Sequence, residues 1–404
     1  MSTAIHSGAP CGAFAAWGRP ARALMHRGRA GIGTAVLAGL ALGVAVGPVA
    51  WGAGAADGAV LDTLLRGVEH RGALVEGAKG VLGIEVVASE EYLAARRWEL
   101  DEQFAAGGFA DPPELQRRDI ACVRFAYDRD RYAWHFALLN DSGWDWWGIG
   151  ERLGTATRGK PPLASLHGGG ASDGEYTYSY NGNQRTCTVR PRTGTSRAHE
   201  LLGIFDAHFV RTFGPAYLHV FRTDMAPRLL GETRVDGEVC SVVGGVGTHP
   251  APKGMKRLWI SPRLGFAVVR MEKIEINDKG RVSTCLVQTA SSFQQFGEDL
   301  WLPGVFRIDH FGFLGQDVGW DFTKRFFLEH VVVNQPVAFR ISDYMFPANS
   351  TWFDASDRAM LWDGGQAIRR RIEGLPLPTP DPLGEQVRQH ADDLEQWFMQ
   401  VPAG

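Results

Sequence analysis

The stretch Leu258-Trp-Ile-Ser-Pro-Arg-Leu-Gly-Phe-Ala-Val-Val-Arg270 joins two apolar runs through a turn that contains proline and glycine. The second run continues to Ile276 and turns again at Asn277-Asp-Lys-Gly280 into residues 281–289. Gly, Pro, Asn and Asp favour tight turns, and short apolar runs between such turns are typical of antiparallel strands. This stretch therefore predicts three strands that follow one another directly.

The same alternation of runs and turns continues on both sides of this stretch. Further strands are predicted at residues 82–86, 120–127, 132–138, 176–180, 185–189, 230–235, 239–243, 301–311 and 325–333. Two of the turns are Asn181-Gly182 and Asp236-Gly237, and such pairs between alternating runs are the strongest short hairpin signal. Strands joined by short turns predict an antiparallel meander rather than a βαβ series.

Helices are predicted at three places around this meander. Apolar residues recur at helical spacing from Leu61 to Ala78, with a stop at Gly80, and again from Leu201 to Phe213. In the tail, prolines at every second position from Pro376 to Pro382 predict a stiff linker before a terminal amphipathic helix at residues 383–398. We expect this helix to pack on the body or to bind a partner. The charged segment 96–118 and the Trp- and Gly-rich segment 143–173 are predicted to be insertions or loops.

The N-terminal segment predicts export. Arginines precede a run without charged residues between Arg29 and Asp57, and small residues, Ala53-Gly-Ala55, end that run. This order is typical of a signal peptide. Because Gly31–Trp51 offers the roughly 20 residues that span a bilayer, a retained anchor is an alternative, and a soluble apolar tail is a third. Either of the first two places the protein in the periplasm or cell envelope.

Composition and cysteine spacing exclude several classes of function. A net charge of −3 provides no basic surface for nucleic acid. Four cysteines follow the leader, at Cys122, Cys187, Cys240 and Cys285. None of them forms a C-x-x-C pair, so a zinc cage is not predicted. In an oxidising compartment they could form two disulfides, with the pairing left open, or remain buried free thiols.

A hydrolase site on the His167–Ser172 loop is a third and weaker hypothesis. His167-Gly-Gly-Gly170 matches an oxyanion-loop pattern, and Gly170-Ala-Ser-Asp-Gly174 matches G-x-S-x-G. The mechanism requires a strand before the serine, a helix after it and a separate oxyanion loop, whereas here the two patterns overlap in one loop and a strand follows Ser172. The sequence therefore predicts no enzyme, and no metal site or cofactor is predicted either.

Aromatic residues are the remaining signal. Tyr132, Trp134 and Phe136 share one face of a predicted strand, as do Tyr176 and Tyr178 in another. A curved sheet with aromatic inner faces is either filled by a helix or encloses an apolar ligand. Both interpretations, core packing and a hydrophobic cavity, stay open at this stage.

The order of these features resembles the LolA/LolB-like superfamily, in particular the longer outer membrane lipoprotein-sorting proteins. The resemblance covers residues 60–355 and is carried by the helix at 61–78, Tyr176-Thr-Tyr-Ser-Tyr-Asn-Gly182, the 258–270 stretch, and the closing segment from Val333-Asn-Gln-Pro336 to Phe346-Pro-Ala-Asn-Ser-Thr-Trp-Phe-Asp354. It implies a mainly antiparallel β (α+β) fold, an unclosed β-barrel or strongly curved sheet wrapped on one or more helices. It also implies an apolar cavity for acyl chains.

These observations lead to one hypothesis and one alternative. Residues 1–56 form a signal peptide or anchor, 57–360 a half-barrel domain, and 361–404 a Pro-rich linker with a C-terminal helix. The domain holds a lipid, acyl or lipoprotein group and associates with the membrane at least transiently. We expect Trp134, Phe136, Tyr178 and Trp259 to line its cavity. Alternatively, it is a structural or sensor-like envelope protein that binds another protein through its concave face or through the Trp-rich loop at 143–147.

Overall fold

The computed structural model describes residues 55–107, 115–128, 131–139, 167–181, 186–191, 221–247, 253–277, 279–314, 317–335 and 365–401. Contacts divide the chain into Met1–Gly52 and Ala53–Gly404, and every described residue belongs to the second unit. The predicted leader, the helix at 201–213 and the Trp-rich loop therefore lie outside the described residues. Within the described part, no helix has the length and apolar character needed to cross a bilayer.

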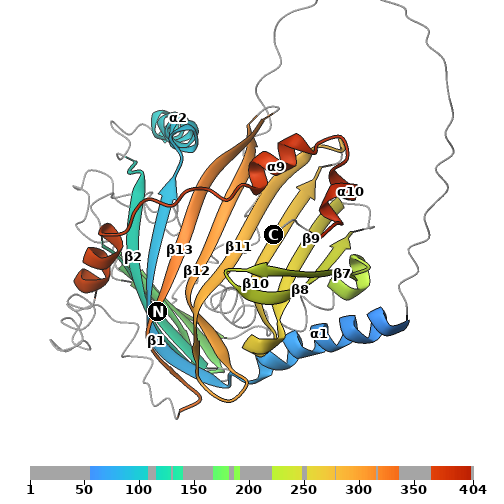
Figure 1. The fold of residues 1–404 in the computed structure, drawn as a ribbon. Helices are drawn as coiled ribbons and strands as arrows, with labels where there is room; N and C mark the ends of the chain where they lie inside the picture. Colours follow the sequence, from blue (N-terminus) through green and yellow to red (C-terminus); the bar gives the residue numbers. More distant parts are fainter. Residues whose placement is uncertain are drawn as a thin grey trace, which may run out of the picture. The chain divides into compact units, whose positions relative to one another are not determined.

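A single 13-stranded sheet dominates the fold (Figure 1). Its strands are β1 Gly77–Ala88, β2 Arg118–Asp128, β3 Arg131–Leu138, β4 His167–Ser172, β5 Tyr176–Asn181, β6 Thr186–Pro191, β7 Arg228–Val235, β8 Glu238–Val246, β9 Lys253–Ser261, β10 Ala267–Ile276, β11 Val282–Gln295, β12 Trp301–Leu314 and β13 Asp317–Val333. The spatial order is β6-β5-β4-β3-β2-β1-β13-β12-β11-β10-β9-β8-β7. All neighbours are antiparallel, and β6 and β7 end the sheet without closing it. The predicted fold class is confirmed.

Two meanders meet where the first strand pairs with the last. The sheet runs from β1 to β6 in one direction and from β13 back to β7 in the other. The β1–β13 pairing joins Leu82 to Leu328 and Ile84 to Phe326. A contact so distant in sequence costs loop-closure entropy, which the apolar side chains of these two strands offset by packing together.

Strand β4 corrects one prediction. Residues 167–172 were expected to belong to a long loop, but they form a strand between β3 and β5. Gly170 makes room for a large neighbour, because a Cβ at this position would lie 2.7 Å from Nε1 of Trp134. Glycine is unfavourable in strands unless another group approaches closely, which is the situation here.

The helices differ from the predictions in their ends. Helix α1 (Ala55–Ala73) stops before the predicted Gly80, because Val75 and Ala78 already pack in the sheet's apolar cluster. Part of the predicted insertion at 96–118 is helix α2 (Glu90–Gly107). The single terminal helix is instead two short ones, α9 (Leu383–Gln389) and α10 (Leu394–Phe398). The interruption follows His390, whose ring stacks on Trp397 at a centroid distance of 4.8 Å.

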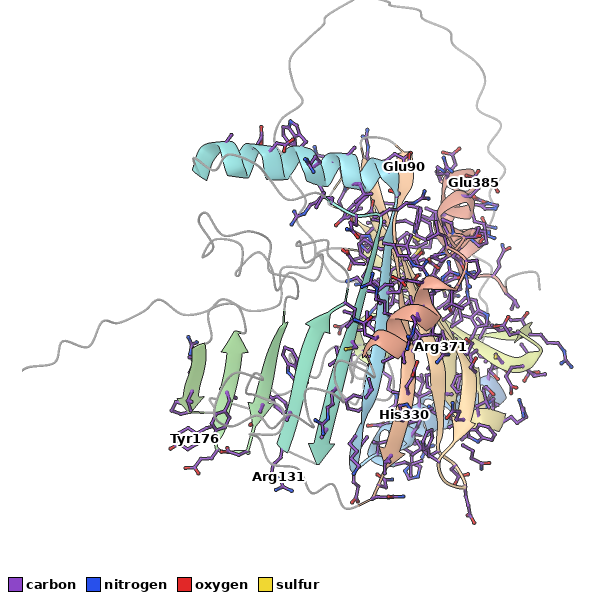
Figure 2. The ribbon with its side chains drawn as sticks, turned by 90° about the vertical axis from the view of Figure 1, so that its left-hand side faces the viewer. Glu90, Arg131, Tyr176, His330, Arg371 and Glu385 are labelled. Carbon is purple, nitrogen blue, oxygen red and sulfur yellow. The ribbon has the colours of Figure 1, made fainter. Side chains whose placement is uncertain are left out.

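The two faces of the sheet are covered by different parts of the chain. Helix α1 packs against one face, here called the α1 face, beside Leu258, Val243 and Met271. Residues 365–401, here called the strap, cover the other face, here called the strap face. The strap comprises a helical stretch at 365–373, an extended Pro-rich stretch, α9 and α10. Figure 2 shows β2 to β6 bending toward the side from which α2 projects, with Arg371 and Glu385 of the strap on the opposite side. The α1 face is therefore the concave one.

Candidate ligand-binding face

The strap face is closed by a row of arginines that hold the strap. The arginines belong to β2, β13, β12, β10 and β9, and they meet the strap in the order of its sequence. Arg118 donates to the carbonyls of Ile372, Glu373 and Leu375, Arg325 to the carbonyl of Pro376, and Arg307 to the carbonyl of Thr379. Arg270 donates to the carboxylate of Asp381, and Arg257 to the carbonyl of Gln400. Arginine suits this task because its planar group offers five donors.

The proline spacing of the strap fits these donors. Proline has no N–H, so the alternating prolines leave fewer backbone donors to satisfy in this stretch, and the Pro376 carbonyl accepts from Arg325. Asp381 anchors the end of this stretch, with its carboxylate oxygens 2.8 and 3.0 Å from the Arg270 guanidinium nitrogens. The prolines predicted as a stiff linker form an extended segment that is held on the sheet.

Buried carboxylates complete the strap face. Glu85 is fully buried, accepts from Arg118 at 2.7 Å and also accepts from Arg325. Glu272, 2% exposed, accepts from Arg257 at 2.8 Å, and its other oxygen accepts from Arg270. Because these charges are paired and hydrogen-bonded, the face needs no external ligand to compensate them.

The α1 face is apolar over most of its area. Its two clusters include Leu82, Phe306 and Phe326 in one and Leu258 and Met271 in the other. Leu286 of β11 is only partly buried and packs against both clusters. Other partly buried apolar side chains on the first cluster are Phe293, Phe296, Phe322, Leu328, Val331 and Val333. These side chains give the concave face apolar surface that the described part of the chain does not fully cover.

A polar patch interrupts this apolar surface. We define it as Lys256, Lys273, Glu275, His310 and Asp321. Lys256 and Lys273 are direct partners across β9 and β10, and Lys273 Nζ lies 2.5 Å from the Glu275 carboxylate. His310 Nδ1 lies 2.9 Å from Asp321 Oδ2. Burial and the neighbouring Lys273 lower the pKa of Lys256 to about 8.

Phe322 supports one side of this patch. The His310 ring stacks on it at 4.8 Å with an interplanar angle of 4°. Lys324 Nζ lies 5.1 Å from the centre of the same ring, and Tyr92 of α2 contacts it edge-on. The imidazole is thus held both by a hydrogen bond and by an aromatic platform.

Of the four residues predicted to line a cavity, the three whose side chains the structure describes do not lie together. Trp134 is buried on the α1 face, in the cluster with Phe125. The side chain of Phe136 lies outside the described part. Tyr178 pairs with Ala171, which pairs with Ala133, so it faces the side opposite Trp134. Its hydroxyl donates to Asp173 at 2.6 Å, and that bond raises the pKa of Tyr178 to about 12.

Trp259 is also on the strap face. It is 2% exposed and lies beneath the guanidinium groups of Arg257 and Arg270, 5.4 and 5.5 Å from its ring centre. Its role is therefore to support the arginine row. Because side chains alternate along a strand, Trp259 points away from its neighbour Leu258, which packs on the α1 face.

The three cysteines whose side chains the structure describes, and Ser172, are buried. Cys122, Cys240 and Cys285 are buried free thiols, so the disulfide alternative is wrong for these three. The side chain of Cys187 lies outside the described residues. Burial raises the pKa of Cys122 to about 12. Ser172 is fully buried, and its oxygen accepts from the Gly174 amide at 3.2 Å in a turn. In the described part, no group of three His, Cys, Asp or Glu residues could hold a metal ion.

The arginine row was missed at the sequence level, although a signal for it exists. Arg270 and Glu272, and likewise Arg307 and Asp309, are opposite charges two residues apart within apolar strands. Residues at that spacing share a face, so each pair predicts an ionic surface on a central strand. A partner for that surface could be sought in the Pro-rich tail.

Comparison with known proteins gives structural likeness only. No family model and no curated protein matches the sequence. The fold is similar to a putative outer membrane lipoprotein-sorting protein domain from Vibrio parahaemolyticus, at 8% identity over 69% of this chain and 94% of that one, with a TM-score of 0.34. A DUF1329 family protein from Desulfovibrio piger gives the same values. The Mycobacterium tuberculosis lipoprotein LppX matches at 8% identity over 70% and 99%, with a TM-score of 0.24.

The first of these structures is described as the kind of protein that the sequence resembles. At such low identity, the ligand of this chain has to be inferred from its own two faces.

Proposed function

We propose that this chain is an exported, non-enzymatic binding protein that holds an acyl or other apolar group against its concave α1 face. The observation that carries the proposal is the difference between the two faces. The strap face is covered and its charges are paired, whereas the α1 face has partly buried apolar side chains, among them Leu286 and Phe322. Trp134 contributes to the same face.

Apolar burial would supply the affinity. Each buried methylene contributes about 0.8 kcal/mol, so an acyl chain of ordinary length provides enough to offset the cost of association. Because the sheet is not closed, a chain can enter between its ends without unfolding the protein. Lipid or lipoprotein acyl groups are the ligands that suit this arrangement, and they imply at least transient contact with a membrane.

Native mass spectrometry of the full chain, purified from the envelope of its own cells, tests this proposal. We expect an excess mass that disappears after organic extraction and returns when the extracted protein is mixed with the recovered lipid. The extracted and reloaded samples control for nonspecific adducts. A protein that is consistently empty contradicts the proposal, and an empty chain that copurifies with one stoichiometric protein favours the alternative of an envelope partner.

A further inference from the structure

We infer that Gln288 on the α1 face binds a hydroxyl group within the apolar part of the ligand, so that the preferred ligand is a hydroxylated acyl chain. This inference rests on the proposed function and deepens it by naming a polar group that the ligand carries. The observation behind it is an uncharged amide in the middle of an apolar surface, whose oxygen accepts no hydrogen bond from the described part of the chain.

The strand register places Gln288 among apolar side chains on four sides. Gln288 of β11 pairs with Met271 of β10 and with Ile308 of β12. Along its own strand, Leu286 and Ala290 are the next residues on the same face, because side chains alternate. All four neighbours belong to, or pack against, the two apolar clusters of the α1 face. The amide is therefore an isolated polar group in apolar surroundings.

The amide oxygen has unmet hydrogen-bonding capacity. Oε1 of Gln288 is buried from solvent, and none of the described residues donates a hydrogen bond to it. A buried acceptor without a partner carries a free-energy cost that an apolar residue at the same position would avoid. A ligand that donates a hydrogen bond to Gln288 removes this cost.

The polar side chains that lie diagonal to Gln288 are engaged elsewhere. Lys273 Nζ on β10 lies 2.5 Å from the Glu275 carboxylate, and His310 Nδ1 on β12 lies 2.9 Å from Asp321 Oδ2. Because both groups are paired with carboxylates, the partner for the Gln288 oxygen has to come from the ligand.

A hydroxyl group matches this position. It both donates and accepts hydrogen bonds, and it is small enough to lie within an acyl chain. The half-buried Gln288 side chain can turn about its last torsion, which is broad for glutamine, and so direct its oxygen toward the ligand. The four apolar neighbours would then contact the methylenes on either side of the hydroxyl, whereas they disfavour a charged group at this point.

Displacement of the uncharged fluorescent probe N-phenyl-1-naphthylamine from the full chain tests this inference. The competitors are two matched pairs: myristate with 3-hydroxymyristate, and stearate with 12-hydroxystearate. Within a pair the carboxylate and the chain length are the same, so a difference in affinity comes from the hydroxyl. An apolar face without a partner binds the hydroxylated acid more weakly than its parent, because the hydroxyl loses its water. We expect at least one hydroxylated acid to bind about fivefold more tightly than its parent, the gain from one satisfied hydrogen bond.

The variant Q288L shows whether the amide is responsible for this preference. Leucine forms no hydrogen bond, so Q288L should lose the preference and bind the parent acids at least as tightly as the unmodified protein does. Its midpoint of urea denaturation should not fall, because no hydrogen bond to the Gln288 oxygen is lost from the protein. Q294L replaces an exposed glutamine on the same strand and is the matched control, which should keep the preference.

The outcomes separate the inference from the proposed function. If the parent acids displace the probe but neither hydroxylated acid binds more tightly, the inference is overturned and the proposed function stands. A preference that survives in Q288L also overturns the inference, as does a lower urea midpoint of Q288L, since the amide would then have a partner inside the protein. If no acid displaces the probe, the proposed function and the inference fail together.

Discussion

Adjacent residues of the same strands place lysine on one face of the sheet and arginine on the other. Lys256 is followed by Arg257, and Lys324 by Arg325. The arginines lie on the strap face, where carboxylates and strap carbonyls accept their hydrogen bonds. Lys256 lies on the concave α1 face, directly opposite Lys273. The strap face is thus occupied by the chain itself, whereas the lysines lie on the face that carries the partly buried apolar side chains.

This difference predicts that ionic groups on the two faces contribute unequally to stability. Removing a buried partner leaves an uncompensated charge and costs several kcal/mol, whereas a half-exposed ion pair contributes little. The three predictions that follow test this contrast, beginning with the largest expected effect.

Glu85→Ala should be the most damaging change, because it leaves Arg118 and Arg325 without their shared carboxylate. We expect the free energy of unfolding, measured by urea denaturation, to fall by about 3–5 kcal/mol. Glu275→Ala on the α1 face is the matched control and should cost no more than about 1 kcal/mol. Equal losses in the two variants would contradict the contrast between the faces.

Asp381→Asn should have a smaller effect that is centred on the strap. The substitution removes the charge that anchors Arg270, and a hydrogen bond to a charged group is worth about 1.5–3 kcal/mol. We expect limited trypsin digestion to cut the strap at Arg388 much faster than in the unmodified protein. Asp393→Asn, an exposed acid near α10, should leave the cleavage rate unchanged. If both variants are cut at the same rate, Asp381 does not hold the strap.

The effect of Lys256 should be visible as a pH dependence of stability. Its pKa is about 8 in the folded chain and near 10.5 when unfolded, so between these values the unfolded chain binds more protons. Stability therefore rises with pH across this window, relative to a variant without the lysine. We expect the difference in unfolding free energy between the unmodified protein and K256Q to be flat below pH 8 and to increase above it. A difference that stays flat up to pH 10 would show that Lys256 is not desolvated.

The strands could be predicted from the sequence because their signals are local. The turns at Asp236-Gly237 and Asn277-Asp-Lys-Gly280 lie between strands that pair as expected, β7 with β8 and β10 with β11. The pairing of β1 with β13 could not be predicted, since neither strand carries a local signal that specifies a partner so distant in sequence. Strand β4 was not predicted because its consecutive glycines are typical of a loop. In the structure, the space beside Gly170 is filled by the side chain of Trp134.

The candidate site could be predicted only in part. Aromatic and apolar residues indicated an apolar face, and Trp134 lies on it. From the sequence alone, Trp259 could not be distinguished from a residue that lines a cavity. In the structure it lies beneath Arg257, whose guanidinium donates a hydrogen bond to the strap. The polar patch depends on register across β9 to β12, which links Lys256 to His310 only after the strands are paired.

The central claim is that ligand binds the α1 face and not the strap face, and one pair of variants on β11 tests it directly. Leu286 packs on the α1 face and Val282 on the strap side, and both are partly buried apolar residues. The measurement is the affinity of the full chain for N-phenyl-1-naphthylamine, with circular dichroism to confirm folding. We predict that Leu286→Gln weakens binding about tenfold, whereas Val282→Gln leaves it unchanged. Weaker binding in Val282→Gln, with Leu286→Gln unaffected, would contradict the assignment of the two faces.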